Sequence, residues 1–90
     1  MSRASDLLEI ANELGMHARA ATKFVQTANR HHSEITVEKD GQVVNGKSIM
    51  GVLLLVASKG TRIKVTAEGD DAEAALAALS QLVRDKFGED

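Results

Sequence analysis

The sequence predicts a fold of the α/β (α+β) class, a two-layer open-faced sandwich in which three helices cover one face of a four-stranded antiparallel sheet. Three observations lead to this prediction. The spacing of apolar residues switches between strand and helix periods in the order β-α-β-β-α-β-α. The expected strands alternate polar with apolar residues, as in a sheet with one buried face. Proline is absent, so glycines and polar turns mark the boundaries.

A strand, a helix and a hairpin are expected in the first half of the chain. Residues 6–11 predict a short strand and residues 12–15 a turn. From Ala18 the apolar residues follow helical spacing, which predicts an amphipathic helix that ends around residues 29–30. The positions on which these predictions depend are Leu8 and Ile10 in the strand, and Ala21, Phe24, Val25 and Ala28 in the helix.

The hairpin is predicted by a second alternating segment. Residues 33–38 alternate in the manner of a half-buried strand. Asp40 and Gly41 follow it, and both tolerate the positive φ angles of a tight hairpin turn. Val43 and Val44 then continue into a short return strand.

The second half predicts a helix, a strand and a helix. Residues 47–57 are predicted to form a short helix that ends before Gly60, with a buried strand as the alternative because the run is too apolar for periodicity to decide. Residues 61–68 alternate as a strand, and Asp70 with Glu73 three residues later predicts a capped last helix. The inward-facing residues are expected to be Ile63, Val65 and Ala67 in the strand, and Leu76, Leu79, Leu82 and Val83 in the helix.

Length and composition exclude several classes of function. Ninety residues predict a single domain over 1–90, and 11 basic against 13 acidic residues leave a net charge of −2 with only two aromatic residues. This balance argues against a nucleic-acid-binding protein. The absence of cysteine excludes disulfides and agrees with a cytoplasmic location. No apolar run approaches the length of a membrane span, and the N-terminal residues do not resemble a secretory signal.

The segment from Gly15 to Thr22 contains the strongest candidate for chemistry. His17 stands at the start of the predicted helix, and Arg19 follows two residues later. The first amide groups of a helix attract anions, and a guanidinium group binds phosphate oxygens. Neutral imidazole is a competent nucleophile near pH 7. The pattern therefore indicates a histidine that accepts and passes on a phosphoryl group, with a helix-capping surface histidine as the alternative.

Two motifs resemble the HPr family, the histidine-containing phosphocarriers of the bacterial phosphotransferase system. Residues 15–21, Gly-Met-His-Ala-Arg-Ala-Ala, are similar to the family's phosphorylation-site motif, and residues 47–51, Lys-Ser-Ile-Met-Gly, match a second motif. The resemblance extends over nearly the whole chain and includes the predicted order of elements. One departure is Ala20, which stands where the family usually has proline, and we expect a slightly looser turn with the chemistry kept.

The resemblance implies a carrier that is not itself an enzyme. Enzyme I, phosphorylated by phosphoenolpyruvate, would pass the phosphoryl group to Nδ1 of His17, and the A domain of a sugar permease or a regulatory counterpart would receive it. Arg19 would stabilise the transferring charge. No cofactor, metal, nucleic acid or membrane is implied, and a monomer is expected.

The second motif implies regulation and docking. Ser48 would be phosphorylated by an HPr kinase/phosphorylase, or would simply cap its helix. The surface that binds partner proteins is expected to comprise Thr22, Lys23, Lys47, Ile49, Met50 and Leu53.

Other interpretations remain open or are disfavoured. A regulatory or nitrogen-branch carrier without sugar transport is one alternative, and a non-catalytic α/β binding module is another. A histidine-based hydrolase is disfavoured because the sequence places neither a carboxylate nor a nucleophile near His17. Metal binding at His31 and His32 is disfavoured because no third ligand is near. The acidic tail, Asp85 with Glu89 and Asp90, is expected to be a solvated end.

Overall fold

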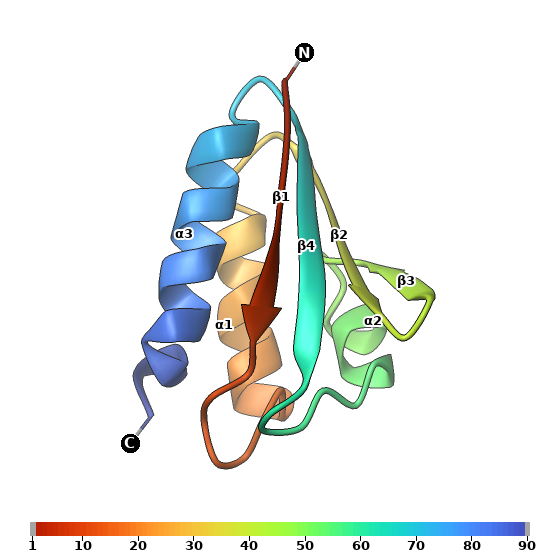
Figure 1. Ribbon diagram of the computed structural model, residues 1–90. Helices are drawn as coiled ribbons and strands as arrows, with labels where there is room; N and C mark the ends of the chain where they lie inside the picture. The colour runs from red at the N-terminus through yellow and green to blue at the C-terminus, as the bar shows by residue number, and fades with distance from the viewer. Residues whose placement is uncertain (1, 90) are drawn as a thin grey trace.

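The computed structural model describes residues 2–89, and its elements follow the predicted order (Figure 1). Four antiparallel strands form one sheet in the order β1-β4-β2-β3, and the helices cover one of its faces. The predicted fold class is confirmed. The elements are β1 (Ser2–Glu9), α1 (Ala18–Ala28), β2 (Glu34–Lys39), β3 (Gln42–Asn45), α2 (Ile49–Leu54), β4 (Arg62–Gly69), α3 (Ala72–Arg84) and a 3₁₀ turn, η1 (Lys86–Gly88).

The first strand begins earlier than residues 6–11 predict. All eight residues of β1 pair with β4, from Ser2 opposite Gly69 to Glu9 opposite Arg62. Backbone hydrogen bonds to β4 hold the polar first half of this edge strand in place. A prediction based on the alternation of apolar residues does not detect such a polar segment. Ile10 lies just beyond the strand, yet it is fully buried and its amide donates to the carbonyl oxygen of Thr61 at 2.9 Å.

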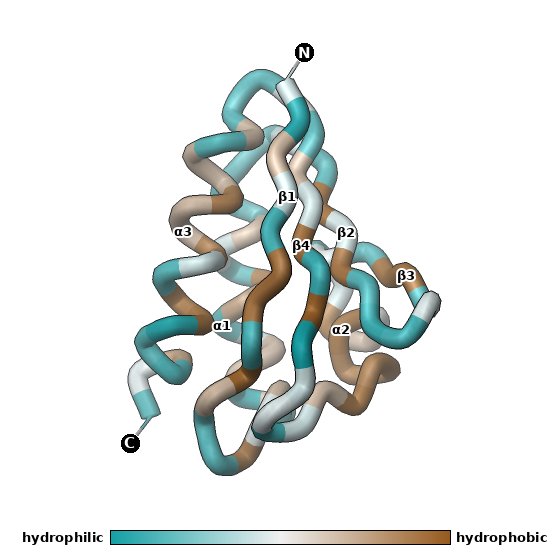
Figure 2. The backbone as a smooth tube through the Cα atoms, in the orientation of Figure 1, coloured by the Kyte–Doolittle hydropathy of each residue, from teal (hydrophilic) through white to brown (hydrophobic). Residues whose placement is uncertain are grey.

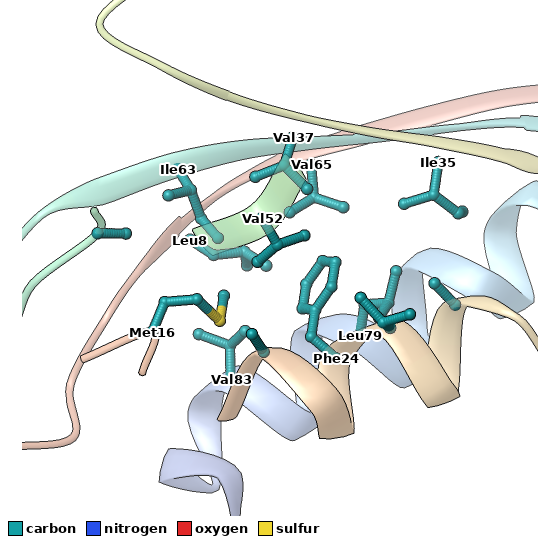
Figure 3. Packing of buried hydrophobic residues seen from close by; sticks show 14 of the residues in the cluster. Leu8, Met16, Phe24, Ile35, Val37, Val52, Ile63, Val65, Leu79 and Val83 are labelled. Atoms are coloured by element: carbon teal, nitrogen blue, oxygen red, sulfur yellow. The ribbon is translucent and has the colours of Figure 1, made fainter. Parts of the chain in front are cut away.

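The core lies between the sheet and the helices. Figure 3 shows the ring of Phe24 on α1 directed toward the inward-facing residues of the strands, beside Leu79 of α3. Phe24, Leu79, Ile63 and Val65 have no exposed surface. Burial of each such side chain is worth about 1.5–3 kcal/mol, so this layer holds α1 and α3 against β4. Ala67 is also buried, as the alternation of β4 predicts.

The segment predicted as a short helix is indeed helical, so the alternative of a buried strand is wrong. The helix is shorter than residues 47–57, because α2 runs only from Ile49 to Leu54. The side chain of Ser48 caps it by accepting a hydrogen bond from the amide of Gly51 at 3.1 Å. Beyond its end Val56 takes a left-handed backbone angle, φ 49°, which stops the helical path.

The predicted cap of the last helix is wrong. The residue at the N-cap of α3 is Asp71, not Asp70, and its side chain makes no capping bond. Its carboxylate instead accepts hydrogen bonds from the amides of His32 and Ser33, each at 2.9 Å. The loop before β2 needs these acceptors because Ser33 is buried. On α3, Leu79 and Val83 are buried as predicted, Leu76 and Leu82 are half-buried, and Ala72 and Ala75 complete the buried stripe.

The turn before α1 fits closely against the segment that follows α2. Gly15 has φ 64°, and a Cβ atom there would lie 2.6 Å from the carbonyl oxygen of Ala57. The amide of Met16 donates to that same oxygen at 2.8 Å. This contact places the start of α1 beside residues 56–58. No helix within residues 2–89 has the length and apolar character needed to cross a membrane.

Candidate functional site

His17 occupies the N-cap of α1. Its backbone is extended, with φ −78° and ψ −178°, and its carbonyl oxygen accepts from the amide of Ala21 at 2.8 Å. Its ring nitrogen Nδ1 accepts from the amide of Arg19 at 3.3 Å. Since an acceptor nitrogen carries the lone pair, the lone pair of the ring lies on Nδ1 and faces the first turn of the helix.

The other ring nitrogen contacts a carboxylate from the end of the chain. Nε2 of His17 is hydrogen bonded to Oε2 of Glu89, across 72 positions of sequence. The expectation that the acidic tail is a solvated end is therefore wrong for Glu89, whose side chain is only 16% exposed. The statement that no carboxylate lies near His17 is wrong for the same reason. Asp90, the last residue of that tail, lies outside the described residues.

Asn12 holds this carboxylate in place. Its side chain is fully buried, and Nδ2 donates to Oε1 of Glu89 at 2.9 Å and to the carbonyl oxygen of Gly15 at 2.8 Å. The hydrogen bond from Asn12, followed by that from His17, holds the pKa of Glu89 below its ordinary value of 4.5. Glu89 is therefore ionised at neutral pH.

Two cationic residues of α1 lie near Glu89, the carboxylate that contacts His17. Arg19 is exposed and, with Lys23, lines a shallow hollow that Leu14, Gly88 and Glu89 also border. The ammonium group of Lys23 is occupied, since it donates to the carbonyl oxygen of Phe87 at 2.6 Å. Arg19 thus supplies the exposed positive charge on this side of His17.

An apolar surface also adjoins the histidine. Met50 is 71% and Ile49 41% exposed on α2, whereas Leu53 is half-buried and borders a hollow that also touches His17. In Figure 2, α2 and the segment after it are strongly hydrophobic in colour. We refer to the exposed apolar residues of α2 and of the two loops beside His17 as the apolar patch, and they are Leu14, Ile49, Met50, Leu54 and Val56.

Sequence reasoning missed three members of this patch. Leu14 and Val56 are 70% and 74% exposed, in the loops that Gly15 brings together, and Leu54 is 61% exposed. Apolar residues in turns next to the histidine motif were the available signal. For Glu89 and Asn12 no local signal exists, because their contact depends on where the chain ends in space.

The polar residues expected at the partner surface are held by the fold. The hydroxyl of Thr22 donates to the carbonyl oxygen of Ala18 at 2.8 Å, one turn back on α1. The ammonium of Lys47 donates to the carbonyl oxygen of His31 at 2.7 Å. Ser48 is half-buried at the start of α2, next to the apolar patch.

The histidine pair lies away from this site. Nδ1 of His31 is 3.5 Å from Oδ2 of Asp71, and the neighbouring His32 is exposed. Within residues 2–89 no group of three or more potential ligands is assembled for a metal ion.

Comparisons with known proteins agree closely. Residues 4–85 match the family model described as "PTS HPr component phosphorylation site". The chain is 50% identical over 82 residues to the phosphocarrier protein HPr of Neisseria meningitidis, covering 91% of this chain and 92% of that protein. It is 43% identical over 79 residues to the HPr-like protein Crh of Bacillus subtilis, covering 88% and 93%. A crystal structure of HPr from Thermoanaerobacter tengcongensis superposes with a TM-score of 0.91 at 50% identity, over 100% of this chain and 99% of that one.

Proposed function

The chain belongs to the HPr family of phosphocarrier proteins of the phosphotransferase system, and we propose that it carries the phosphoryl group on Nδ1 of His17. As a family member it is a carrier and not an enzyme. The family implies two partners, enzyme I as donor and the A domains of permeases as acceptors. The observation that supports the proposed site is the hydrogen bond from the Arg19 amide to Nδ1, which directs the nucleophilic lone pair toward the start of α1.

The transfer step follows from this geometry. The lone pair on Nδ1 attacks the phosphorus atom carried by enzyme I and forms an N–P bond. The bond between phosphorus and the donor atom of enzyme I breaks, and its electron pair stays on that donor atom. At the acceptor, a nucleophilic atom of the A domain attacks phosphorus and forms the new bond, while the N–P bond breaks and its electron pair returns to Nδ1. No further covalent chemistry is needed, so positioning and charge stabilisation dominate.

The helix start and Arg19 supply the charge stabilisation. When Nδ1 becomes bonded to phosphorus, the amide of Arg19 loses its present acceptor and is free to donate to a phosphoryl oxygen. The exposed guanidinium of Arg19 binds the same oxygens. At the position of the family's usual proline, Ala20 retains an amide N–H in this first turn.

The apolar patch is proposed to bind the partner proteins. Met50 and Ile49 are exposed on α2, and Leu53 adjoins His17 at the base of the patch. An exposed apolar surface of this kind beside a reactive residue is typical of an interaction site. Thr22, Lys23 and Lys47, the polar residues expected at this surface, are engaged in hydrogen bonds of their own, so they contribute shape and charge. One small face that several partners must use in turn favours a monomer.

Ser48 is proposed as a regulatory phosphorylation site for an HPr kinase/phosphorylase. A phosphate there would add about −1.5 to −2 charges beside the apolar patch. The start of α2 tolerates this charge, whereas a partner that presents apolar or acidic groups would be repelled. Capping by Ser48 and regulation through it are compatible.

The test is intact mass after incubation with phosphoenolpyruvate, Mg²⁺ and enzyme I. The wild type should gain one acid-labile, base-stable phosphate, and His17→Ala should gain none. His32→Ala is the matched control, since His32 is exposed and distant from the site, and it should gain one phosphate. An unmodified wild type, with enzyme I active on another carrier, would contradict the proposal and favour a binding module in which His17 only caps its helix.

The similarity to Crh, whose solved structure is described as the catabolite repression HPr of Bacillus subtilis, supports a second candidate, a regulatory carrier without sugar transport. Both candidates load at His17, so the acceptor distinguishes them. Transfer from the phosphorylated protein to a permease A domain supports the first, and transfer to regulatory domains alone supports the second.

A further inference from the structure

We propose that Glu89 is a positioning residue for phosphoryl transfer, because its carboxylate holds the proton of His17 on Nε2 and so keeps the lone pair on Nδ1. This inference deepens the proposed function and rests on it for its role in transfer. The relevant contacts join the end of the chain to the turn before α1, through Glu89, His17 and Asn12.

The imidazole ring is constrained at both nitrogens. An ionised carboxylate can only accept a hydrogen bond, so the proton between Glu89 and His17 belongs to Nε2. The amide of Arg19 can only donate, so Nδ1 must accept. The two contacts select the same tautomer. A carboxylate that orients a histidine in this way is the arrangement that activates the ring in hydrolytic triads.

The side-chain amide of Asn12 is oriented so that its Nδ2 group donates to the carboxylate of Glu89. Both hydrogen bonds of its amide group come from Nδ2, one to Glu89 and one to the carbonyl oxygen of Gly15. Among residues 2–89 its buried Oδ1 atom has no hydrogen-bond partner. The two Nδ2 contacts set the orientation of the amide group, and one of them is made to the carboxylate of Glu89.

The tail that carries Glu89 is folded back by its own anchors. Phe87 is fully buried, and its carbonyl oxygen accepts from Lys23. Lys86, Phe87 and Gly88 have φ angles of 55°, 56° and 76°. Left-handed backbone at two consecutive residues other than glycine is unfavourable and is maintained only where packing over-determines it. The side chain of Glu89 is thus directed to His17 by the core.

The same contact stabilises the phosphorylated state. When Nδ1 bonds to phosphorus while Nε2 keeps its proton, the ring becomes positively charged. The carboxylate of Glu89 lies against that charge, and the low pKa of Glu89 keeps it ionised. When the phosphoryl group leaves, the ring returns to the neutral tautomer from which it started. No proton has to move during either transfer.

The experiment compares Glu89→Ala and Glu89→Gln with the wild type. Asp85→Asn is the matched control, because Asp85 belongs to the same C-terminal segment but its carboxylate accepts a hydrogen bond from the side chain of Gln81. Two quantities are measured for each variant. The ¹⁵N chemical shifts of the His17 ring report the tautomer in the free protein, and quenched-flow mass spectrometry reports the rate of transfer from phosphorylated enzyme I.

In the wild type and in Asp85→Asn we expect an Nε2–H ring with a deprotonated Nδ1. In Glu89→Ala the two ring shifts should move toward each other, because both tautomers become populated. The transfer rate should fall about three- to tenfold in Glu89→Ala and in Glu89→Gln, and it should stay at the wild-type value in Asp85→Asn. A residue with a merely structural role would leave the ring shifts unchanged.

The inference fails if the His17 shifts in Glu89→Ala equal those of the wild type, or if its transfer rate is unchanged. Failure of the proposed function looks different, since the wild type would then carry no phosphate on His17. The tautomer measurement does not require transfer, so it tests the role of Glu89 on the ring in either case.

Discussion

Lys23 and Phe87 join the middle of α1 to the end of the chain. The ammonium group of Lys23 donates to the carbonyl oxygen of Phe87 at 2.6 Å, while the ring of Phe87 is fully buried. The tail is therefore attached to the helix by a polar contact and to the core by an apolar one. Glu89, whose carboxylate contacts His17, follows this anchor by two residues.

Phe87→Ala should destabilise the protein and release Glu89. Removal of a buried aromatic ring leaves a cavity and costs about 3 kcal/mol of unfolding free energy. Urea denaturation measures that loss, and the His17 ring shifts should move as they do in Glu89→Ala. Phe87→Leu, which keeps most of the apolar volume, should lose less than about 1.5 kcal/mol. A loss below 1 kcal/mol for the alanine variant would show that the tail is not anchored by its ring.

Asp71 should make the stability of the fold sensitive to acid. Hydrogen bonds from the hydroxyl of Ser33 and the amide of His32 hold its pKa well below the ordinary value of 3.8. An acid with a lowered pKa in the folded state contributes stability above pH 3.8, and that stability is lost as the pH falls below this value.

Asp71→Asn should therefore be less stable than the wild type at pH 7, and its stability should depend less on pH between about 4 and 2. Thermal unfolding across this range measures both effects. The control is Asp70→Asn, an exposed neighbour whose substitution should preserve the acid dependence. Equal acid dependence in the wild type and Asp71→Asn would contradict the assignment.

Val56 should be a site where stability and partner binding are opposed. It is 74% exposed and has φ 49°, a conformation that is unfavourable for a β-branched residue. Val56→Asn should raise the unfolding free energy by about 0.5–1 kcal/mol, because asparagine tolerates left-handed backbone better.

The same substitution removes part of the apolar patch, so the KM of enzyme I for this protein should increase. Val43→Asn is the control, since Val43 is exposed on β3 with ordinary strand geometry. This control should gain no stability and should leave the KM unchanged. If Val56→Asn is more stable but binds enzyme I as tightly as the wild type, Val56 lies outside the docking surface.

Substitutions at Ser48 can separate the effect of an added negative charge from the effect of helix capping. Aspartate and asparagine both cap helices well, so Ser48→Asp and Ser48→Asn should keep the stability of α2 within about 0.5 kcal/mol of the wild type. Only the aspartate variant adds a negative charge beside the apolar patch. We expect the rate of phosphoryl transfer from enzyme I, measured by quenched-flow mass spectrometry, to be lower for Ser48→Asp than for Ser48→Asn. Equal rates would argue against regulation by charge at this position.

The helices and strands of the fold could be predicted from the sequence because they depend on local periodicity. The helical spacing of Phe24 with its neighbours and the alternation of Ile63 and Val65 each bury one face, whatever the partner. The hairpin turn was also predictable, because Asp40 and Gly41 take the positive φ angles, 52° and 83°, that these residues tolerate. The errors concern ends and caps. The N-cap residue of α3 is Asp71 and not the predicted Asp70. Its carboxylate accepts hydrogen bonds from a distant loop instead of capping its own helix.

The sequence by itself determined the antiparallel sheet, the helices that cover it, and the histidine with its arginine at the start of α1. These features arise from residues close together in the chain, where spacing alone specifies which side chains share a face. Only the tertiary structure brought Glu89 to His17, Asn12 to Glu89, and Leu14 with Val56 to the edge of the site. Burial of Phe87 and the close fit of Gly15 against Ala57 bring these distant segments together, and neither contact leaves a periodic pattern in the sequence.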